Sequence, residues 1–408
     1  MTPRSVRRVS DPSGRPNPSR PRLLTARFAL VVTAGTAYFV SVAMLLPVLP
    51  RYVEDELGGG SVAVGVTTGS FFVGAVLLRP FAGRLGDRMG RRVLIVGGGV
   101  FVGLATAAYG LVAAQWWVVL ARVVGGMGEA AFFVGAATMI TDLAPVERRG
   151  EAVSYWSVAV YSGLAFGPPL GEWVLGDDRF VAVWLVSAAL GLVAGGVGLF
   201  TRDVPRTTTT VSPTRLLHPR ALGPGLVLFL GLIGLAGFTA FVPLYVDDIG
   251  LDDAGGSFLL YGVLILIVRV AGARLPDRLG ARRSAAAALV FAAIGTAVMA
   301  AWASVPGLVV GTIVFAGGMS LMYPALLLLA LDGVPDNERA SSVGTISSFF
   351  DLSQGLGGLI CGTAAALAGE RGAFFAGTVA AVVGVAVLRR STHPERGGAD
   401  TVVVPPLA

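Results

Sequence analysis

Residues 79–92 read RPFAGRLGDRMGRR, and residues 269–282 read RVAGARLPDRLGAR. The two stretches lie 190 residues apart (269 minus 79) and agree at seven positions. In the first copy the shared residues are Arg79, Arg84, Leu85, Asp87, Arg88, Gly90 and Arg92. At the same separation, Asp142 and Pro145 are matched by Asp332 and Pro335. Matches in order at one separation indicate an internal duplication, so we expect two related halves.

The composition around this repeat is typical of a membrane protein. The chain has 408 residues, of which 54% are hydrophobic and 14% are charged. A soluble domain usually carries about 25% charged residues, and a disordered chain is less apolar than this one. A soluble enzyme is therefore the weaker interpretation, and lipid is the expected solvent.

Apolar segments of about 17 or more residues, long enough to span a bilayer, recur along the whole chain. The twelve segments are 28–50, 61–82, 93–113, 116–140, 152–175, 180–200, 222–246, 257–275, 284–303, 306–330, 341–368 and 373–389. Lipid offers the backbone no hydrogen-bond partner, so helices are expected. With the duplication, these segments predict an all-α membrane protein with twelve transmembrane helices in two pseudo-symmetric six-helix bundles.

Polar segments and arginines give the expected domains and orientation. We expect a disordered basic tail (1–22), a first bundle (23–200), a linker (201–221), a second bundle (222–390) and a second tail (391–408). All 31 residues counted as Lys or Arg are arginine, and the loops on the side of the termini hold 25 of them against 3 opposite. Both termini are therefore expected in the cytoplasm, with the protein in the cell membrane. This asymmetry accounts for the net charge of +6 without a nucleic-acid partner.

The residues that usually bind cofactors are absent or badly placed. Cys361 is the single cysteine and cannot form an intrachain disulfide, and His218 and His393 lie in polar segments without a zinc signature. The string 126–131 fits a dinucleotide pattern, but it lies inside one apolar segment rather than between a strand and a helix. A phosphate loop requires a lysine, and this chain contains none. We therefore expect neither an enzyme nor a cofactor other than the proton.

The repeated stretch closely resembles the loop motif of the major facilitator superfamily, and the resemblance spans all twelve segments. The matching pattern is Gly83-x-Leu85-x-Asp87-Arg88-x-Gly90-Arg91-Arg92, with a partial second copy that includes Asp277 and Arg278. The resemblance implies a transporter in which this loop latches onto the segment that begins near Ser341, so that breaking the latch shifts a conformational equilibrium. The alternative is that these charges only set the topology.

Two further patterns are similar to motifs of the drug–proton antiporters within that superfamily. They are Arg122-x-x-x-Gly126-x-Gly128-x-Ala130-Ala131 and Gly163-x-x-x-Gly167-Pro168-x-x-Gly171. The second is associated with exporters, although Glu172 stands where that motif has its last glycine. Gly163, Gly167 and Gly171 share one helix face, where small residues allow close approach. This face predicts a seal between the two halves or, alternatively, ordinary close packing.

Charged residues inside the apolar segments are candidates for proton coupling. Arg122 and Glu129 share a helix face but stand about 10 Å apart along the axis, too far for direct contact. A charge at mid-membrane costs about 2.5–3.5 kcal/mol, so Glu129 and Asp351 are expected to face the bundle interior. Burial disfavours the ionised form of a carboxylate, so each could exchange a proton or bind a cationic substrate. Structural ion pairs are the alternative. Arg79 and Arg269 are interpreted as arginines whose apolar side-chain stems extend along the helix, so that the guanidinium reaches the membrane surface.

The resemblance also implies a central cavity lined mainly by the first, fourth, seventh and tenth segments and their neighbours. Candidate lining residues are Tyr38, Met44, Phe133, Tyr155, Trp156, Phe238, Phe241, Met319 and Tyr323. Aromatic and methionine side chains suit varied apolar ligands, although each one alone could be core packing.

Together these features predict a proton-coupled exporter of a hydrophobic or amphipathic small molecule. The partners we expect are that small molecule and the lipid bilayer, with no nucleic acid and with the chain as a monomer. An importer or facilitator of a nutrient or metabolite in the same fold is the alternative. A receptor or scaffold is disfavoured because the loops are short.

Overall fold

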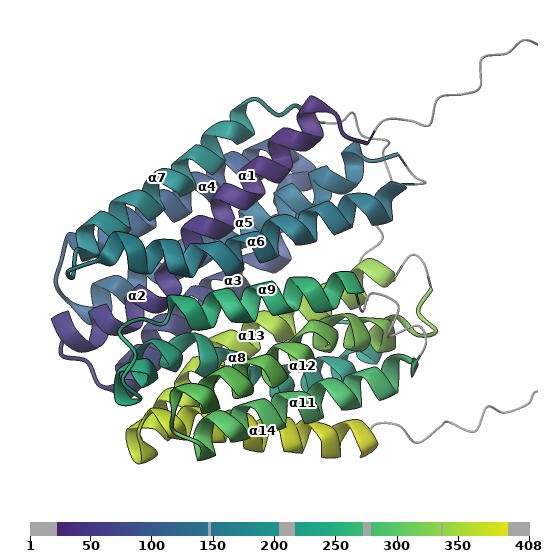
Figure 1. The fold of residues 1–408 in the computed structure, drawn as a ribbon. Coiled ribbons are helices and arrows are strands. Elements are labelled where there is room, and N and C mark those ends of the chain that lie inside the picture. Colours follow the sequence, from purple (N-terminus) through teal and green to yellow (C-terminus); the bar gives the residue numbers. More distant parts are fainter. Residues whose placement is uncertain (1–22, 146–147, 204–216, 272–278, 336–337, 391–408) are drawn as a thin grey trace, which may run out of the picture.

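The computed structural model describes residues 23–145, 148–203, 217–271, 279–335 and 338–390. Long helices form two bundles that lie one above the other in Figure 1. The first bundle contains α1 (Ala26–Ala43), α2 (Leu45–Arg51), α3 (Ser61–Met89), α4 (Arg91–Ala107), α5 (Gln115–Leu143), α6 (Arg149–Leu175) and α7 (Phe180–Leu199). The second contains α8 (Pro219–Asp248), α9 (Gly255–Ala271), α11 (Ala281–Ala301), α12 (Val305–Leu331), α13 (Arg339–Ala368) and α14 (Glu370–Arg390). A short π-helix at Tyr52–Glu56 and a 3₁₀ turn at Ala108–Gly110 extend α2 and α4.

The all-α, two-bundle membrane fold predicted from the sequence is confirmed. Each predicted apolar segment coincides with a long helix, and α1 continues through α2 to form the first span. Among the described residues, nine helices are long and apolar enough to cross a membrane. Both predicted tails and most of the predicted linker lie outside the described residues, so the domain boundaries there stay predictions.

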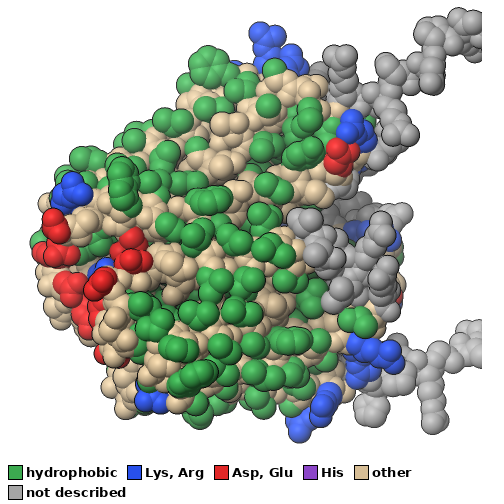
Figure 2. All heavy atoms as spheres, in the orientation of Figure 1, with side chains coloured by type: hydrophobic (Ala, Val, Ile, Leu, Met, Phe, Trp, Pro, Cys, Tyr) green, Lys and Arg blue, Asp and Glu red, His purple; other side chains and the backbone are tan. Residues whose placement is uncertain are grey.

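The surface of the helices matches a lipid environment. Large apolar side chains face outward on both bundles, for example Trp173 (77% exposed) and Phe375 (62%). Figure 2 shows such side chains spread over the flanks of both bundles. A soluble monomer rarely exposes apolar patches of this extent. The first residues of α1 and the last residues of α14 lie at the same end of the molecule, here called the terminal end (Figure 1).

Acidic side chains gather at the opposite end of the molecule, on the left in Figure 2. They include the exposed Glu54, Asp55, Asp247 and Asp252, which follow the first and seventh predicted segments. This separation of acidic from basic residues agrees with the loop asymmetry read from the sequence.

Two pairs of helices join the bundles, and the duplication relates one pair to the other. α3 packs against α13, and α9 packs against α6. At the opposite end α2 also packs against α8, and Val53 and Val64 share a buried apolar cluster with Phe241 and Leu244 of the second bundle. The bundles therefore also share a buried apolar contact toward the opposite end.

Candidate functional site

Three charged side chains meet between the bundles, and we call them the charge triad: Arg79 of α3, Glu129 of α5 and Asp351 of α13. Arg79 Nη2 donates to Glu129 Oε2 at 2.9 Å and to Asp351 Oδ1 at 3.0 Å. Arg79 Nε lies 2.5 Å from Asp351 Oδ2. The three side chains are 13%, 13% and 2% exposed. Because Asp351 belongs to the second half, the triad is an ion pair that crosses between the halves.

The triad forms near the middle of its helices because α3 and α13 cross very closely. Gly65 and Gly69 of α3 face Gly355 and Gly358 of α13, and a Cβ on Gly358 would lie 2.5 Å from the Gly65 carbonyl oxygen. Only glycines allow two backbones to approach this closely. Asp351 precedes Gly355 by one turn and Gly358 by two, so it shares their face and points toward the first half.

Arg79 was interpreted as an arginine that reaches the membrane surface, and that interpretation is wrong. The predicted segment ended at residue 82, which made Arg79 nearly terminal. The helix in fact continues to Met89, ten residues beyond Arg79, which is about 15 Å along the axis. The guanidinium therefore pairs with carboxylates inside the protein. The length of the helix, rather than its hydropathy, carries this information.

Arg122 lies elsewhere, as its spacing from Glu129 predicted. Its Nη2 donates to the Thr68 carbonyl oxygen at 2.9 Å and its Nε to that of Thr67 at 3.3 Å. The guanidinium carbon lies 4.6 Å from the centre of the Phe71 ring. These contacts hold α5 against α3. Arg122 has no ion pair with a described residue, and it takes no part in the charge triad.

The end of the loop motif, at the start of α4, contacts α5 and the segment that follows α7. Gly90 adopts φ +103° between α3 and α4. The Arg92 backbone N–H donates to Asp203 Oδ1 at 3.0 Å, and Arg91 Nε lies 3.3 Å from Asp142 Oδ2. Gly83 and Arg88 are exposed. No motif reveals the role of Asp203, because it lies 111 residues from Arg92 along the chain.

The predicted latch onto α13 stays a prediction. The side chain of Asp87 lies outside the described residues, and so do Asp277 and Arg278 of the second copy.

Replacement of Gly90 by alanine is expected to destabilise the protein. The backbone there is left-handed, and a Cβ would collide with the Asp203 carboxylate. Such strain costs about 1–3 kcal/mol. Thermal unfolding of the purified protein measures the effect, and Gly83→Ala is the matched control because no atom lies within 4 Å of a Cβ there. Equal melting temperatures for the two variants would contradict the strain argument.

The glycine face of α6 packs within the first half, which differs from the expected seal between the halves. A Cβ on Gly167 would lie 2.7 Å from the Ala43 Cβ, and Cβ atoms on Gly163 and Gly171 would collide with Phe39 and Met44. All three neighbours belong to α1 or immediately follow it. The alternative of ordinary close packing therefore describes these glycines, and Pro168 lies inside the same helix.

Closure between the halves at the opposite end comes from another set of groups, which we call the Arg51 clamp. Arg51 Nη1 lies 3.2 Å from Glu172 Oε2, and its Nη2 donates to the Asp252 carbonyl oxygen at 3.3 Å. Glu172 Oε1 accepts the Ala254 backbone N–H at 3.2 Å. Residues of the first half thus bind backbone groups of the second. No motif reveals the role of Arg51, because its carboxylate and backbone partners lie 121 or more residues away along the chain.

The candidate cavity residues divide into buried and partly exposed groups. Packed in the core are Tyr38, Met44, Trp156, Phe238, Phe241 and Met319. Partly exposed are Phe133, Tyr155 and Tyr323. The centre of the Phe133 ring lies 5.3 Å from the Arg79 guanidinium carbon. The Tyr323 hydroxyl lies 3.3 Å from Ser347 Oγ. Phe133 and Tyr323 are therefore best placed to contact a ligand beside the charge triad.

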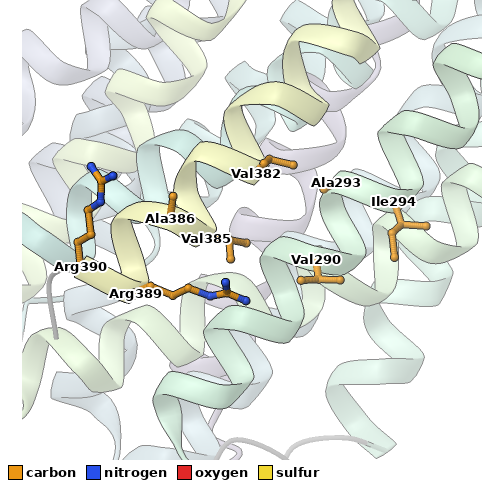
Figure 3. A pocket seen from close by; sticks show the side chains of 8 residues that line it. All are labelled: Val290, Ala293, Ile294, Val382, Val385, Ala386, Arg389 and Arg390. Carbon is orange, nitrogen blue, oxygen red and sulfur yellow. The ribbon is translucent and has the colours of Figure 1, made fainter.

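A groove of about 540 Å³ opens between α11 and α14 (Figure 3). Its lining is Val290, Ala293, Ile294, Val382, Val385, Ala386, Arg389 and Arg390. Val290, Ile294 and Val382 are exposed on the flank of the second bundle, so this groove faces lipid and is separate from the charge triad.

Comparison with known proteins agrees with this architecture. The family model described as Major Facilitator Superfamily matches residues 31–357 and 258–404. An uncharacterized MFS-type transporter of Salmonella typhimurium is 30% identical over 362 residues, which cover 86% of this chain and 92% of that protein. An uncharacterized MFS-type transporter of Burkholderia mallei is 27% identical over 394 residues, covering 91% and 93%.

Solved structures show the same fold at lower identity. A bacterial homolog of the human lysosomal transporter Spinster, inward-facing and occupied, has a TM-score of 0.74 and 17% identity, and the match covers 89% of this chain and 96% of that one. A variant of the nucleoside transporter NupG has a TM-score of 0.76 and 14% identity, with coverage of 89% and 99%. Since the family model and the Salmonella relative each span most of its length, this chain belongs to the Major Facilitator Superfamily and is a membrane transporter.

Proposed function

We propose that this chain exports a hydrophobic or amphipathic small molecule across the cell membrane in exchange for protons. The charge triad is the observation that supports the coupling. With both carboxylates ionised, the triad carries one net negative charge, and one bound proton makes it neutral. Charges interact strongly in a buried site, so this proton changes the strength of the contact between the halves. A ligand that binds one state better than another shifts the equilibrium between them.

The proposed cycle starts from a state in which the halves are joined at the opposite end. The Arg51 clamp and the glycine crossing hold the halves together there, and the arginine distribution assigns that end to the outside. In the proposed cycle the substrate enters from the cytoplasm, and the halves then rock to open the opposite end. A proton reaches the triad from outside and leaves to the cytoplasm after the reverse motion. Its entry supplies about 2.3 kcal/mol per 100 mV of membrane potential.

Transport into everted membrane vesicles tests the proposal. A panel of toxic compounds, applied to cells with and without the chain, first identifies a compound to which the chain confers resistance. We expect this compound to enter everted vesicles when their interior is acidic, and uptake to stop when the pH gradient is reversed. Accumulation of the compound in intact cells would instead identify an importer.

Glu129→Gln and Asp351→Asn are expected to remove the response to the pH gradient, because neither amide exchanges a proton. Uptake should fall to the level measured without a gradient, while downhill flux of the compound persists. Glu338→Gln is the matched control, since this carboxylate is 52% exposed and pairs with His218 away from the charge triad. Gradient-driven uptake that survives Glu129→Gln would refute the coupling. The proposal takes the chain as a monomer with both termini in the cytoplasm.

A further inference from the structure

The duplication assigns a counterpart to each member of the charge triad. Adding or subtracting 190 residues relates Arg79 to Arg269, Asp351 to Tyr161, and Glu129 to Met319. The structure keeps this relationship, because Arg269 of α9 lies against Tyr161 of α6 with its guanidinium carbon 4.4 Å from the ring centre. The second arginine therefore lies at the other joint between the halves, but a tyrosine and a methionine replace its two carboxylates.

The charge of Arg269 is not balanced by any described residue. The part of the chain that the structure describes gives it no ion pair and no hydrogen bond, and its buried Nε lacks a hydrogen-bond partner. Arg269 is partly exposed, but it lies within a membrane-spanning segment, where an unpaired charge is costly. Arg122 also lacks a carboxylate partner, but two backbone carbonyl oxygens satisfy its guanidinium. Arg269 is thus the arginine within the spans that remains able to bind an external anion.

The surroundings of Arg269 suit an amphipathic ligand. Tyr161, Tyr261 and Tyr323 all lie within electrostatic range of its charge, and Tyr323 also interacts with Arg79. Neither the Tyr161 nor the Tyr261 hydroxyl is hydrogen-bonded to another described residue, so both remain available as donors. The Tyr261 ring lies 5.0 Å from that of Phe238 and 5.9 Å from that of Phe315. Phe238 and Phe315 are fully buried, so the partly exposed rings of Tyr161 and Tyr323 are the ones that a ligand beside Arg269 can reach.

We propose that Arg269 binds the anionic group of the transported molecule, which makes the substrate an amphipathic organic acid such as a carboxylate. The guanidinium holds the oxyanion, the hydroxyls of Tyr161 and Tyr261 donate to it, and the partly exposed Tyr323 ring contacts the apolar part. This inference rests on the proposed transport function and names its substrate class. The proton and the substrate then bind at two related but different joints between the halves.

Binding of three matched fluorescent probes to the full chain in lipid nanodiscs tests this assignment. The probes are dansylated aminoundecanoic acid, its primary amide, and the corresponding dansylated diamine. A charge-assisted hydrogen bond predicts that the carboxylate binds at least about tenfold more tightly than the amide. Arg269→Gln should remove this difference without changing the affinity of the amide, and Arg269→Lys should keep part of it. Equal binding of acid and amide, preference for the diamine, or no saturable binding of the acid overturns the inference.

Tyr161 offers a second test that leaves Arg269 in place. Tyr161→Asp gives Arg269 an internal carboxylate like the one that Asp351 gives Arg79, so it should abolish the preference for the acid probe. Tyr161→Asn, which is close to Asp in size but neutral, lacks the Tyr161 hydroxyl yet leaves Arg269 without an internal carboxylate, so it should keep part of the preference. If both variants keep or both lose the preference, an internal anion does not compete for Arg269 and the assignment fails.

These binding measurements need no pH gradient, so they fail independently of the proposed coupling. Preference for the amide or diamine, with gradient-driven transport intact, overturns the substrate class alone. Preference for the acid, without any response to the gradient, overturns the coupling alone.

Discussion

Replacement of Arg79 by glutamine is expected to abolish gradient-driven transport and to destabilise the protein. Glu129 and Asp351 would then share a buried site with no cation, although they come from different halves. Removing one partner of a buried ion pair costs about 3–5 kcal/mol. An effect of about 3 kcal/mol on the transport cycle corresponds to a loss of about 100-fold or more in rate. Vesicle uptake and thermal unfolding of the purified protein measure the two effects.

Two further variants separate the charge of Arg79 from its packing. Arg79→Lys keeps the cation and should lose much less stability than Arg79→Gln. Asp351→Asn should lose less stability than Arg79→Gln, because it removes the excess negative charge of the charge triad and leaves Arg79 paired with Glu129. Added to Arg79→Gln, it should restore part of the lost stability, as expected for residues that interact directly. A wild-type melting temperature for Arg79→Gln would show that the charge triad does not hold the halves together.

Replacement of Gly65 by alanine is expected to open the opposite end of the molecule. Its Cβ would collide with the Gly358 carbonyl oxygen and lie 3.1 Å from the Gly362 Cα, so backbone atoms of α13 would have to move. Neither helix can yield locally without losing backbone hydrogen bonds, which lipid does not replace. The halves should therefore separate at this crossing, which would favour the state open at the opposite end.

A cysteine reporter where α2 packs against the second bundle measures this opening. Leu46 of α2 is partly buried against the second bundle, and the single native Cys361 is buried and can be replaced by serine. In a Cys361→Ser background, a membrane-impermeant maleimide should label Leu46→Cys at least about tenfold faster once Gly65→Ala is added. This change corresponds to about 1.4 kcal/mol in the equilibrium between the states closed and open at the opposite end.

Gly97→Ala is the matched control for this effect. Gly97 is also helical, but no atom lies within 4 Å of a Cβ there, so labelling should stay at the background rate. Unchanged labelling in Gly65→Ala would mean that the crossing does not control closure.

The sequence by itself determined the fold and the depth of its charged residues. Three properties can be read from the sequence without a structure: the length of the apolar segments, the distribution of arginine between the loops, and the 190-residue repeat. The cost of a charge in hydrocarbon identified Glu129 and Asp351 as interior residues, and in the structure Asp351 is buried while Glu129, 13% exposed, meets the same arginine.

Only the tertiary structure decided which charges meet. Arg79 and Asp351 are 272 residues apart, and their contact depends on where α3 ends and on how closely glycines let α3 cross α13. The same applies to the Arg51 clamp, whose partners include backbone atoms, and to Arg269, whose counterpart positions hold Tyr161 and Met319. Hydropathy indicates how deep a side chain lies in the membrane. Which ion pair a charged side chain forms depends instead on the direction in which that side chain points across a helix crossing. That direction is set by the packing of the two bundles against each other.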